Sequence, residues 1–137
     1  MAKLLEIVID AVHPASLARF WAAAIEGYAV RAYDDAEIAR LAKLGFTPET
    51  DPTVMVDGPG PTLCFQAERT AKAARNRVHL DIASPDRASE IARLIDLGAR
   101  IRDHHEGFSV LLDPEGNEFC VVERSGRRAA AAKPPVL

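Results

Sequence analysis

Acidic and imidazole side chains stand out in two segments whose other residues are mostly apolar. Both segments are typical of β-strands because aliphatic and β-branched residues dominate them. Successive strand side chains point to opposite faces of a sheet, so each segment predicts one apolar face and one face with ionisable groups. Two interpretations follow, a small-molecule pocket or a solvated sheet face. The ionisable residues are Glu6 and Asp10 in residues 3–10, and His79 and Asp81 in residues 77–83.

His79 and Asp81 are two residues apart and therefore share one strand face. A carboxylate next to an imidazole can orient the ring for acid–base chemistry. The alternative is a structural hydrogen bond beneath the floor of a pocket. The adjacent His104 and His105 point to opposite faces if they lie in a strand, which predicts a surface role and no joint metal chelation.

An internal repeat must position these residues. Each of the two strands leads into a helix with Pro near its start and Gly just past its end, and the same spacing separates Pro14 from Gly27 and Pro85 from Gly98. Ser84 is the expected N-cap of the second helix. Apolar residues at helical spacing predict that each helix covers the apolar face of its sheet. They are Leu17, Phe20, Trp21, Ala24 and Ile25 in the first helix, and Ala88, Ile91 and Ile95 in the second.

Three further strands follow each helix, so both halves are predicted to be βαβββ modules of one domain over residues 3–124. The strands are expected at residues 28–32, 53–56 and 62–66 of module 1 (residues 3–67), and at 99–104, 108–112 and 118–122 of module 2 (residues 77–124). Residues 113–117 predict a hairpin turn. An insertion predicts a short helix capped by Asp35 and ended by Gly45, and residues 34–44 are a hypothetical lid. The tail over 125–137 is predicted to be disordered.

Composition narrows the class of protein. The 137 residues are 48% hydrophobic and 27% charged, as in soluble globular domains, and the formal net charge of -3 argues against nucleic-acid binding. No apolar run is long enough to span a membrane, and the start has no signal-peptide pattern. Two cysteines do not make a disulfide framework, so we expect a cytoplasmic protein with reduced Cys64 and Cys120.

The repeat and its motifs resemble the vicinal oxygen chelate superfamily, in particular glyoxalase-like and bleomycin-resistance-like proteins of the actinobacterial type. The resemblance is carried by the paired modules, Phe20–Trp21 in the first helix, residues 79–82 (HLDI) and residues 113–120 (DPEGNEFC), and it covers residues 3–124. It implies an α+β fold in which two βαβββ modules form a cupped eight-stranded mixed sheet, with helices on the outer face and a ligand cavity inside. It also implies a homodimer.

Enzymes of this superfamily hold a divalent metal with side chains from the first and last strands of each module. Transferred to this chain, those positions are Glu6, or Val8 in a second alignment; Gln66 or Cys64; His79; and Cys120, where the metalloenzymes usually have Glu. The resemblance therefore implies Glu6 and His79 as metal ligands for zinc, iron, nickel or manganese. A set that includes Cys120 would suit zinc better than manganese or magnesium.

Two functions remain open on the sequence. The first is binding or sequestration of a small molecule without a metal, because the last carboxylate ligand is missing. The second is a metal-dependent lyase, isomerase or dioxygenase that acts on a substrate with vicinal oxygens, and the fold alone does not decide between them. The residues expected to bind the ligand are Glu6, Gln66, His79, Asp81, Phe108 and Cys120.

Overall fold

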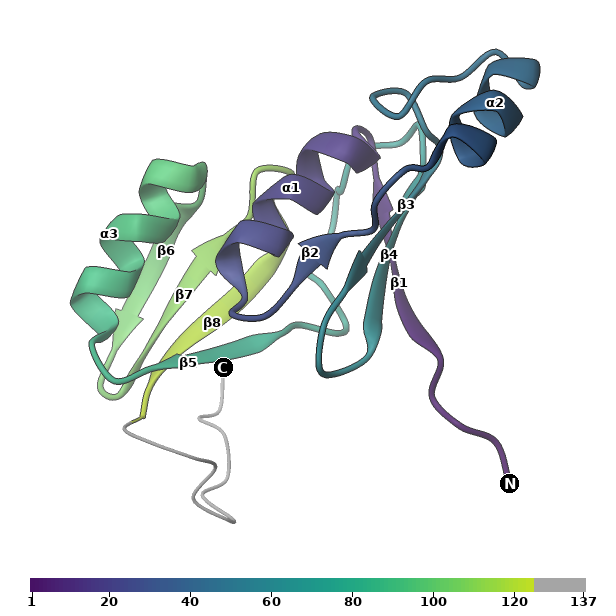
Figure 1. Ribbon diagram of the computed structural model, residues 1–137. Coiled ribbons are helices and arrows are strands. Elements are labelled where there is room, and N and C mark those ends of the chain that lie inside the picture. The colour runs from purple at the N-terminus through teal and green to yellow at the C-terminus, as the bar shows by residue number, and fades with distance from the viewer. Residues whose placement is uncertain (125–137) are drawn as a thin grey trace. The chain divides into compact units, whose positions relative to one another are not determined.

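The computed structural model describes residues 1–124, and the chain divides into two compact units. Unit 1 is Met1–Lys72, and unit 2 begins at Ala73. Within the described residues, each unit contains one four-stranded sheet with a helix packed on one face (Figure 1). We call the opposite side of each sheet the far face. The tail predicted to be disordered, residues 125–137, lies outside the described residues.

Unit 1 is a βαβββ module with an inserted helix. In its sheet the strand order is β1-β4-β3-β2, where β1 runs parallel to β4 and the other neighbours are antiparallel. Its elements are β1 (Glu6–Ala11), α1 (Pro14–Ala24), β2 (Ala29–Val30), α2 (Asp35–Lys43), β3 (Thr53–Asp57) and β4 (Thr62–Ala67).

Helix α1 begins at Pro14, as expected from its fixed φ and missing N–H. The predicted apolar stripe is confirmed, because Leu17, Phe20 and Trp21 are all buried. This stripe covers the side of the sheet that carries Leu63 and Phe65 of β4. The far face of unit 1 is therefore left with Glu6, Val8 and Asp10 of β1 and their neighbours.

Unit 2 repeats the same topology without an inserted helix. The strand order is β5-β8-β7-β6, again with one parallel pair between the first and last strands. Together the two modules confirm the predicted α+β class and the predicted pair of βαβββ modules, each with its own four-stranded sheet. The elements are β5 (Asp81–Ser84), α3 (Arg87–Leu97), β6 (Arg100–His105), β7 (Phe108–Leu112) and β8 (Glu118–Glu123).

Both leading strands begin later than the sequence predicts. Glu6 pairs with Thr62, the first residue of β4, so residues 3–5 have no neighbouring strand to pair with. In unit 2 the ladder begins where Asp81 pairs with Cys120. In the segment that precedes this ladder, the backbone N–H of Asn76 donates to Glu118 Oε2. A side chain of β8 therefore holds this segment, which has not yet joined the strand ladder. His79 consequently precedes β5 rather than lying inside it.

The predicted start of α3 is wrong by two residues. Ser84 does not cap the helix; its hydroxyl accepts from the Asp86 N–H, and the Asp86 carboxylate accepts from the Ser89 N–H as the true N-cap. Pro85 lies outside the helix. The predicted stripe of α3 is confirmed only at Ile91, because Ala88 and Ile95 are exposed and Leu94 is fully buried instead.

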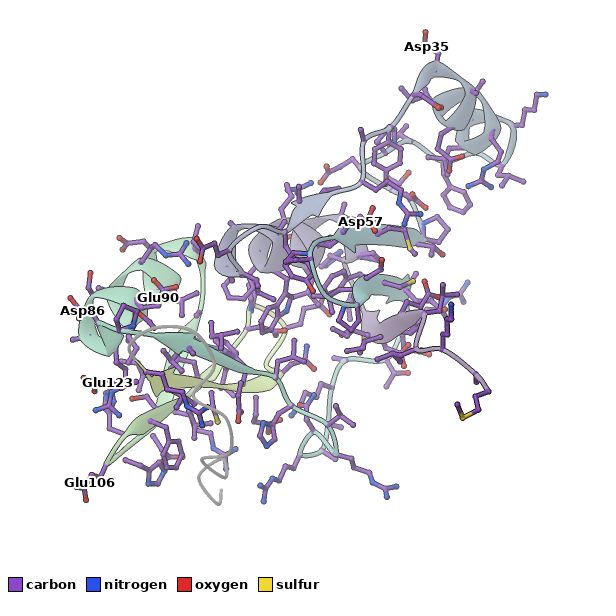
Figure 2. The ribbon with its side chains drawn as sticks, turned by 60° about the horizontal axis from the view of Figure 1, so that its bottom comes forward. Asp35, Asp57, Asp86, Glu90, Glu106 and Glu123 are labelled. Carbon is purple, nitrogen blue, oxygen red and sulfur yellow. The ribbon has the colours of Figure 1, made fainter. Side chains whose placement is uncertain are left out.

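The inserted helix is also capped by a different residue. Asp34, not Asp35, accepts a hydrogen bond from the Glu37 N–H at 2.8 Å. Figure 2 shows Asp35 at the outer end of α2, pointing away from the strands of unit 1. Gly45 follows the helix with φ of 83°, which a residue with a Cβ rarely adopts, so the predicted end is confirmed.

Candidate functional site

The strand register of unit 2 aligns the predicted site residues across the far face. Asp81 of β5 is paired with Cys120 of β8, which is paired in turn with Val110 of β7. Residues paired across a ladder share a face, so all three side chains lie on the far face. Phe119 and Val121 point to the opposite, helix-covered face, where they are buried. The sorting of faces predicted from strand alternation is confirmed here.

His79, Asp81 and Cys120 form a compact polar cluster. One potential ligand atom from each residue, the imidazole nitrogen, a carboxylate oxygen and the thiol sulfur, lies within 4.8 Å of the other two. His79 Nδ1 is 3.2 Å from Asp81 Oδ1, and these two side chains are 32% and 31% exposed. The cluster therefore has a solvent-facing side made of imidazole and carboxylate above a buried thiol.

The environment of Cys120 keeps its thiol protonated. Burial, joined by the negative charge of Asp81 and a hydrogen bond to that carboxylate, raises the pKa of Cys120 to about 11. A carboxylate that accepts from a thiol stabilises the neutral form of the sulfur. At neutral pH Cys120 is thus a poor nucleophile, and it becomes a metal ligand only if a cation displaces its proton.

Phe108 lies at the start of β7 on the same far face. Its ring packs in a buried apolar cluster with Val110, Cys120 and Val122. It also stacks on the ring of His105, with centroids 4.5 Å apart. His104 points the other way and its Nδ1 lies 2.9 Å from the Ser109 hydroxyl, so the two adjacent histidines are on opposite faces as expected.

The corresponding residues of unit 1 are spread along the strands. Glu6 is paired with Thr62, whereas Gln66 is paired with Asp10 four residues further on, which separates Glu6 from Gln66 by about 13 Å along the strands. Cys64 lies between them, opposite Val8. Burial raises the pKa of the Cys64 thiol, and the nearby charge of Glu6 adds to the effect. Of the two residues left open by the sequence, Cys64 is the one within electrostatic reach of Glu6.

The cysteines give a structural alignment of the two modules. Val8 is paired with Cys64 and Asp81 with Cys120 in equivalent parallel ladders, so Val8 corresponds to Asp81. Glu6 then corresponds to His79, because each lies two residues earlier. The same spacing leads from Val8 to Pro14 and from Asp81 to Arg87, the first residues of α1 and α3. Of the two sequence alignments, the one that places the first ligand position at Glu6 agrees with this register.

Both the element order and the family comparison give the same identification. The glyoxalase-like domain family matches residues 6–122, nearly all of the two modules. The chain belongs to this glyoxalase-like domain family. It is therefore a member of the vicinal oxygen chelate superfamily, in agreement with the resemblance found in the sequence.

Solved structures of this glyoxalase-like fold are similar across most of the chain. The fosfomycin resistance protein FosX from Mesorhizobium loti has a TM-score of 0.63 at 12% identity, over 91% of this chain and 94% of its own. A glyoxalase/bleomycin resistance protein/dioxygenase family enzyme from Burkholderia phytofirmans has a TM-score of 0.63 at 14% identity, over 88% and 97%. At such identities the similarity shows the fold alone. A comparison with curated protein sequences gave no match.

A third solved structure carries a metal. A mutant of the fosfomycin resistance protein FosX from Listeria monocytogenes, in complex with Mn(II) and 1S,2S-dihydroxypropylphosphonic acid, has a TM-score of 0.60 at 13% identity, over 91% of this chain and 92% of its own. In the glyoxalase-like chain, the sequence predicted His79 as a metal ligand and considered Cys120, whereas Asp81 was predicted as a partner of His79 and a ligand-binding residue but not as a metal ligand. The strand register that places Asp81 opposite Cys120 is what adds the third donor.

The remaining observation concerns membranes. Across residues 1–124, no helix combines the length and the apolar character needed to cross a bilayer.

Proposed function

We propose that this glyoxalase-like chain binds a small organic molecule at the His79–Asp81–Cys120 cluster without a resident metal ion. The observation that carries the proposal is the set of polar contacts inside the cluster. His79 lies 3.2 Å from Asp81, and the Cys120 thiol donates to the same carboxylate. Each polar group thus has a partner inside the protein, and the raised pKa of Cys120 opposes the thiolate that a metal would require.

The exposed side of the cluster defines what a ligand must offer. Asp81 accepts hydrogen bonds, and the second ring nitrogen of His79 donates or accepts according to its tautomer. A ligand with a hydroxyl next to a second hydroxyl or a carbonyl oxygen would satisfy both groups at once, because the first hydroxyl donates to Asp81 and the second oxygen can match either tautomer of His79 across such a ligand series. Phe108 and Val110 lie behind the cluster in the apolar part of the far face. Because such sites combine a few polar groups with an apolar surround, this surface is suited to an oxygenated molecule with an apolar body.

A zinc-type centre is the second candidate function, and the convergence of three donors within 4.8 Å favours it. Imidazole nitrogen, carboxylate oxygen and thiolate sulfur are the donor types that zinc takes, whereas manganese and magnesium prefer oxygen. The residues therefore fit zinc, with His79, Asp81 and Cys120 as the groups that would hold it. A bound zinc ion supplies Lewis-acid polarisation of a substrate oxygen. Glu6, the equivalent of His79 in unit 1, stays a predicted ligand.

The test is elemental analysis of tag-free protein purified without chelator, combined with thermal-shift measurements. We expect metal far below one equivalent, no stabilisation by zinc, nickel or manganese, and stabilisation by hits from a library of hydroxy-carbonyl compounds. Hits should be lost in His79→Ala and Asp81→Asn and retained in His13→Ala, which changes an exposed histidine at the start of α1.

Two outcomes would overturn the metal-free proposal. Near-stoichiometric zinc that disappears in both His79→Ala and Cys120→Ser would establish the zinc-type centre instead. Ligand binding that is unchanged in His79→Ala and Asp81→Asn, in protein shown to be folded by circular dichroism, would place the ligand elsewhere. Glu6→Ala is measured in parallel, because loss of metal in this variant would make Glu6 part of a zinc centre.

A further inference from the structure

Unit 1 contains a groove that the proposed function does not use. It has a volume of about 500 Å³, within the usual range of small-molecule sites. One wall comes from the start of α2 with Glu37 and Arg40, and the other from Arg31, Tyr33 and Met55. All of its lining residues belong to unit 1, so it does not depend on the His79–Asp81–Cys120 cluster.

A buried carboxylate lies at the groove. Asp51 is only 5% exposed, although it precedes β3 in a connecting segment. Its Oδ2 accepts from the Tyr33 hydroxyl at 2.7 Å, and its Oδ1 accepts from the Thr53 N–H at 2.9 Å. Both donors are neutral. A carboxylate has about four acceptor positions, so two of them are left for a ligand.

Tyr33 is a hydrogen-bond donor to Asp51. Burial raises the pKa of the Tyr33 hydroxyl, and its hydrogen bond to Asp51 raises it further. The hydroxyl therefore stays protonated and acts as the donor in its hydrogen bond to Asp51. A buried carboxylate held by neutral donors such as the Tyr33 hydroxyl and the Thr53 N–H is costly, and a cation placed in direct contact with it lowers that cost.

The two arginines of the groove are already paired. Arg31 donates to Asp57 through two nitrogens at 2.7 and 2.9 Å, and Figure 2 marks Asp57 at the end of β3. Arg40 donates to Glu37 in the same bidentate manner, at 2.9 and 2.6 Å. Arg40 also senses the charge of Asp51, but its paired nitrogens are directed to Glu37.

The balance of charge therefore selects the sign of the ligand. Each of the two arginines is paired with a carboxylate. Asp34 also lines the groove, and its carboxylate caps α2 by accepting from the Glu37 N–H. An anion would have to compete with Asp57 or Glu37 for an arginine. A cation would meet Asp51 without displacing an ion pair. The Tyr33 ring and the Met55 thioether add an aromatic and an apolar surface, which suit the body of an organic cation.

We infer that this groove binds a small organic cation, a primary amine with an apolar or aromatic body, whose ammonium group donates to the Asp51 carboxylate. Tyr33 contributes its ring face and Met55 its side chain. A primary ammonium has three donors, which matches the two acceptor positions left on Asp51 and leaves one for water.

Three probes of equal size test the sign of the charge on the wild-type chain. Benzylamine, benzyl alcohol and benzoate are titrated into ¹⁵N-labelled protein, and amide shifts are followed for residues 31–37 and 51–55. We expect saturable shifts with benzylamine at a dissociation constant of about 1 mM, typical for a ligand of this size, and binding at least about tenfold weaker for the other two. Equal or tighter binding of benzoate, or no saturable binding of benzylamine, would overturn the inference.

A matched pair of variants tests the role of Asp51. Asp51→Asn and Asp35→Asn remove one negative charge each, but Asp35 is exposed and does not line the groove. Benzylamine affinity should fall at least about tenfold in Asp51→Asn and change less than about twofold in Asp35→Asn. Equal losses in the two variants would mean that only net charge matters and would contradict a specific site.

A third variant separates folding from binding. If Asp51→Asn is unfolded by circular dichroism, Tyr33→Phe still tests the site, because it removes a competing donor and keeps the Asp51 charge. Benzylamine binding should then be retained or become tighter. Loss of binding in folded Tyr33→Phe would show that Asp51 does not receive the ammonium group.

Discussion

The two units of this glyoxalase-like chain share one topology but use their far faces differently. In unit 2, Asp81 lies opposite Cys120 and a polar cluster forms. In unit 1 the equivalent pair is Val8 and Cys64, and Glu6 is left without a second carboxylate next to the thiol. A single position in the first strand therefore separates a site with three convergent donors from a face on which the polar groups are spread out.

Unit 1 differs in a second way, because it carries an acidic residue at the end of β3 where unit 2 carries an apolar one at the end of β7. Asp57 at the end of β3 is paired with Arg31, and Thr62 donates a further hydrogen bond to Asp57 at 2.9 Å. The register places Leu112 of β7 at the equivalent position of unit 2. The inserted segment with α2 then builds the groove around Asp51. The repeat thus preserves the core and varies the surface that meets small molecules.

The largest effect should come from the equivalent helix anchors. Trp21 of α1 and Leu94 of α3 occupy the same place in the structural alignment and are 2% and 0% exposed. Trp21→Ala should lower the free energy of unfolding by about 3–5 kcal/mol, and Leu94→Ala should lower it by about 2–5 kcal/mol, because each substitution leaves a cavity. Urea denaturation measures the losses. Ile95→Ala, on the exposed side of α3, should cost less than about 0.5 kcal/mol. A loss from Ile95→Ala as large as that from Leu94→Ala would contradict the assigned packing.

The carboxylate opposite each cysteine should control the acidity of the thiol. Asp81→Asn should lower the pKa of Cys120 from about 11, because the negative charge is removed. Val8→Asp should raise the pKa of Cys64 by placing a carboxylate at the equivalent position of unit 1. The measurement is the pH dependence of alkylation in Cys64→Ser and Cys120→Ser backgrounds, and each pKa unit changes the thiolate fraction about tenfold. Unchanged profiles in both variants would refute the proposed equivalence.

The raised pKa of Cys120 also predicts how stability depends on pH. An unfolded thiol ionises near its ordinary pKa of about 8.5, whereas the folded thiol keeps its proton up to about pH 11. The unfolded state therefore binds fewer protons in this window, and the free energy of unfolding falls as the pH rises. Between pH 8 and 10.5 the wild type should lose more stability than Cys120→Ser, which has no thiol to ionise. Parallel losses in urea denaturation would argue against the shift.

The fold could be predicted from the sequence because the patterns that encode it are periodic. Leu17, Phe20 and Trp21 at helical spacing, and the alternation around Cys120, each encode one face of one element. Element boundaries were less accessible, because they depend on partners distant in sequence. Pro85 has the same local signal as Pro14, yet α3 begins after Asp86, since the Asp86 carboxylate accepts from the Ser89 N–H.

The site could be predicted from the sequence only in part, because it also depends on partners distant in sequence. Strand alternation placed His79 and Asp81 together, but the proximity of Cys120 depends on the register between β5 and β8. The groove around Asp51 had no sequence signal, because Tyr33 and Asp51 are 18 residues apart on either side of α2 and no periodicity connects them. An Asp in an inserted segment is usually a solvated residue.

The caps of α2 and α3 should contribute about equally although the helices differ in packing. Asp34 accepts from the Glu37 N–H and Asp86 from the Ser89 N–H, at 2.8 and 3.0 Å. Asp34→Ala and Asp86→Ala should each cost about 1 kcal/mol in chemical denaturation. Asp35→Ala is the matched control, and its cost should stay within about 0.5 kcal/mol. A larger loss from Asp35→Ala than from Asp34→Ala would restore the cap predicted from the sequence.

The smallest effect should come from the charged pair that unit 2 lacks. The hydrogen bonds from Arg31 hold the pKa of Asp57 below its usual range, so this carboxylate stabilises the fold above pH about 4 and the stabilisation is lost as the pH falls through the lowered pKa. Both side chains are well exposed, at 54% for Arg31 and 42% for Asp57, and solvent screening limits the pair to about 0.5 kcal/mol. Asp57→Asn should therefore be less stable than the wild type at pH 7, and the two proteins should become equal near pH 2. A difference that persists unchanged at low pH would assign the loss to the Thr62 hydrogen bond, because an ion pair cannot survive protonation of its carboxylate.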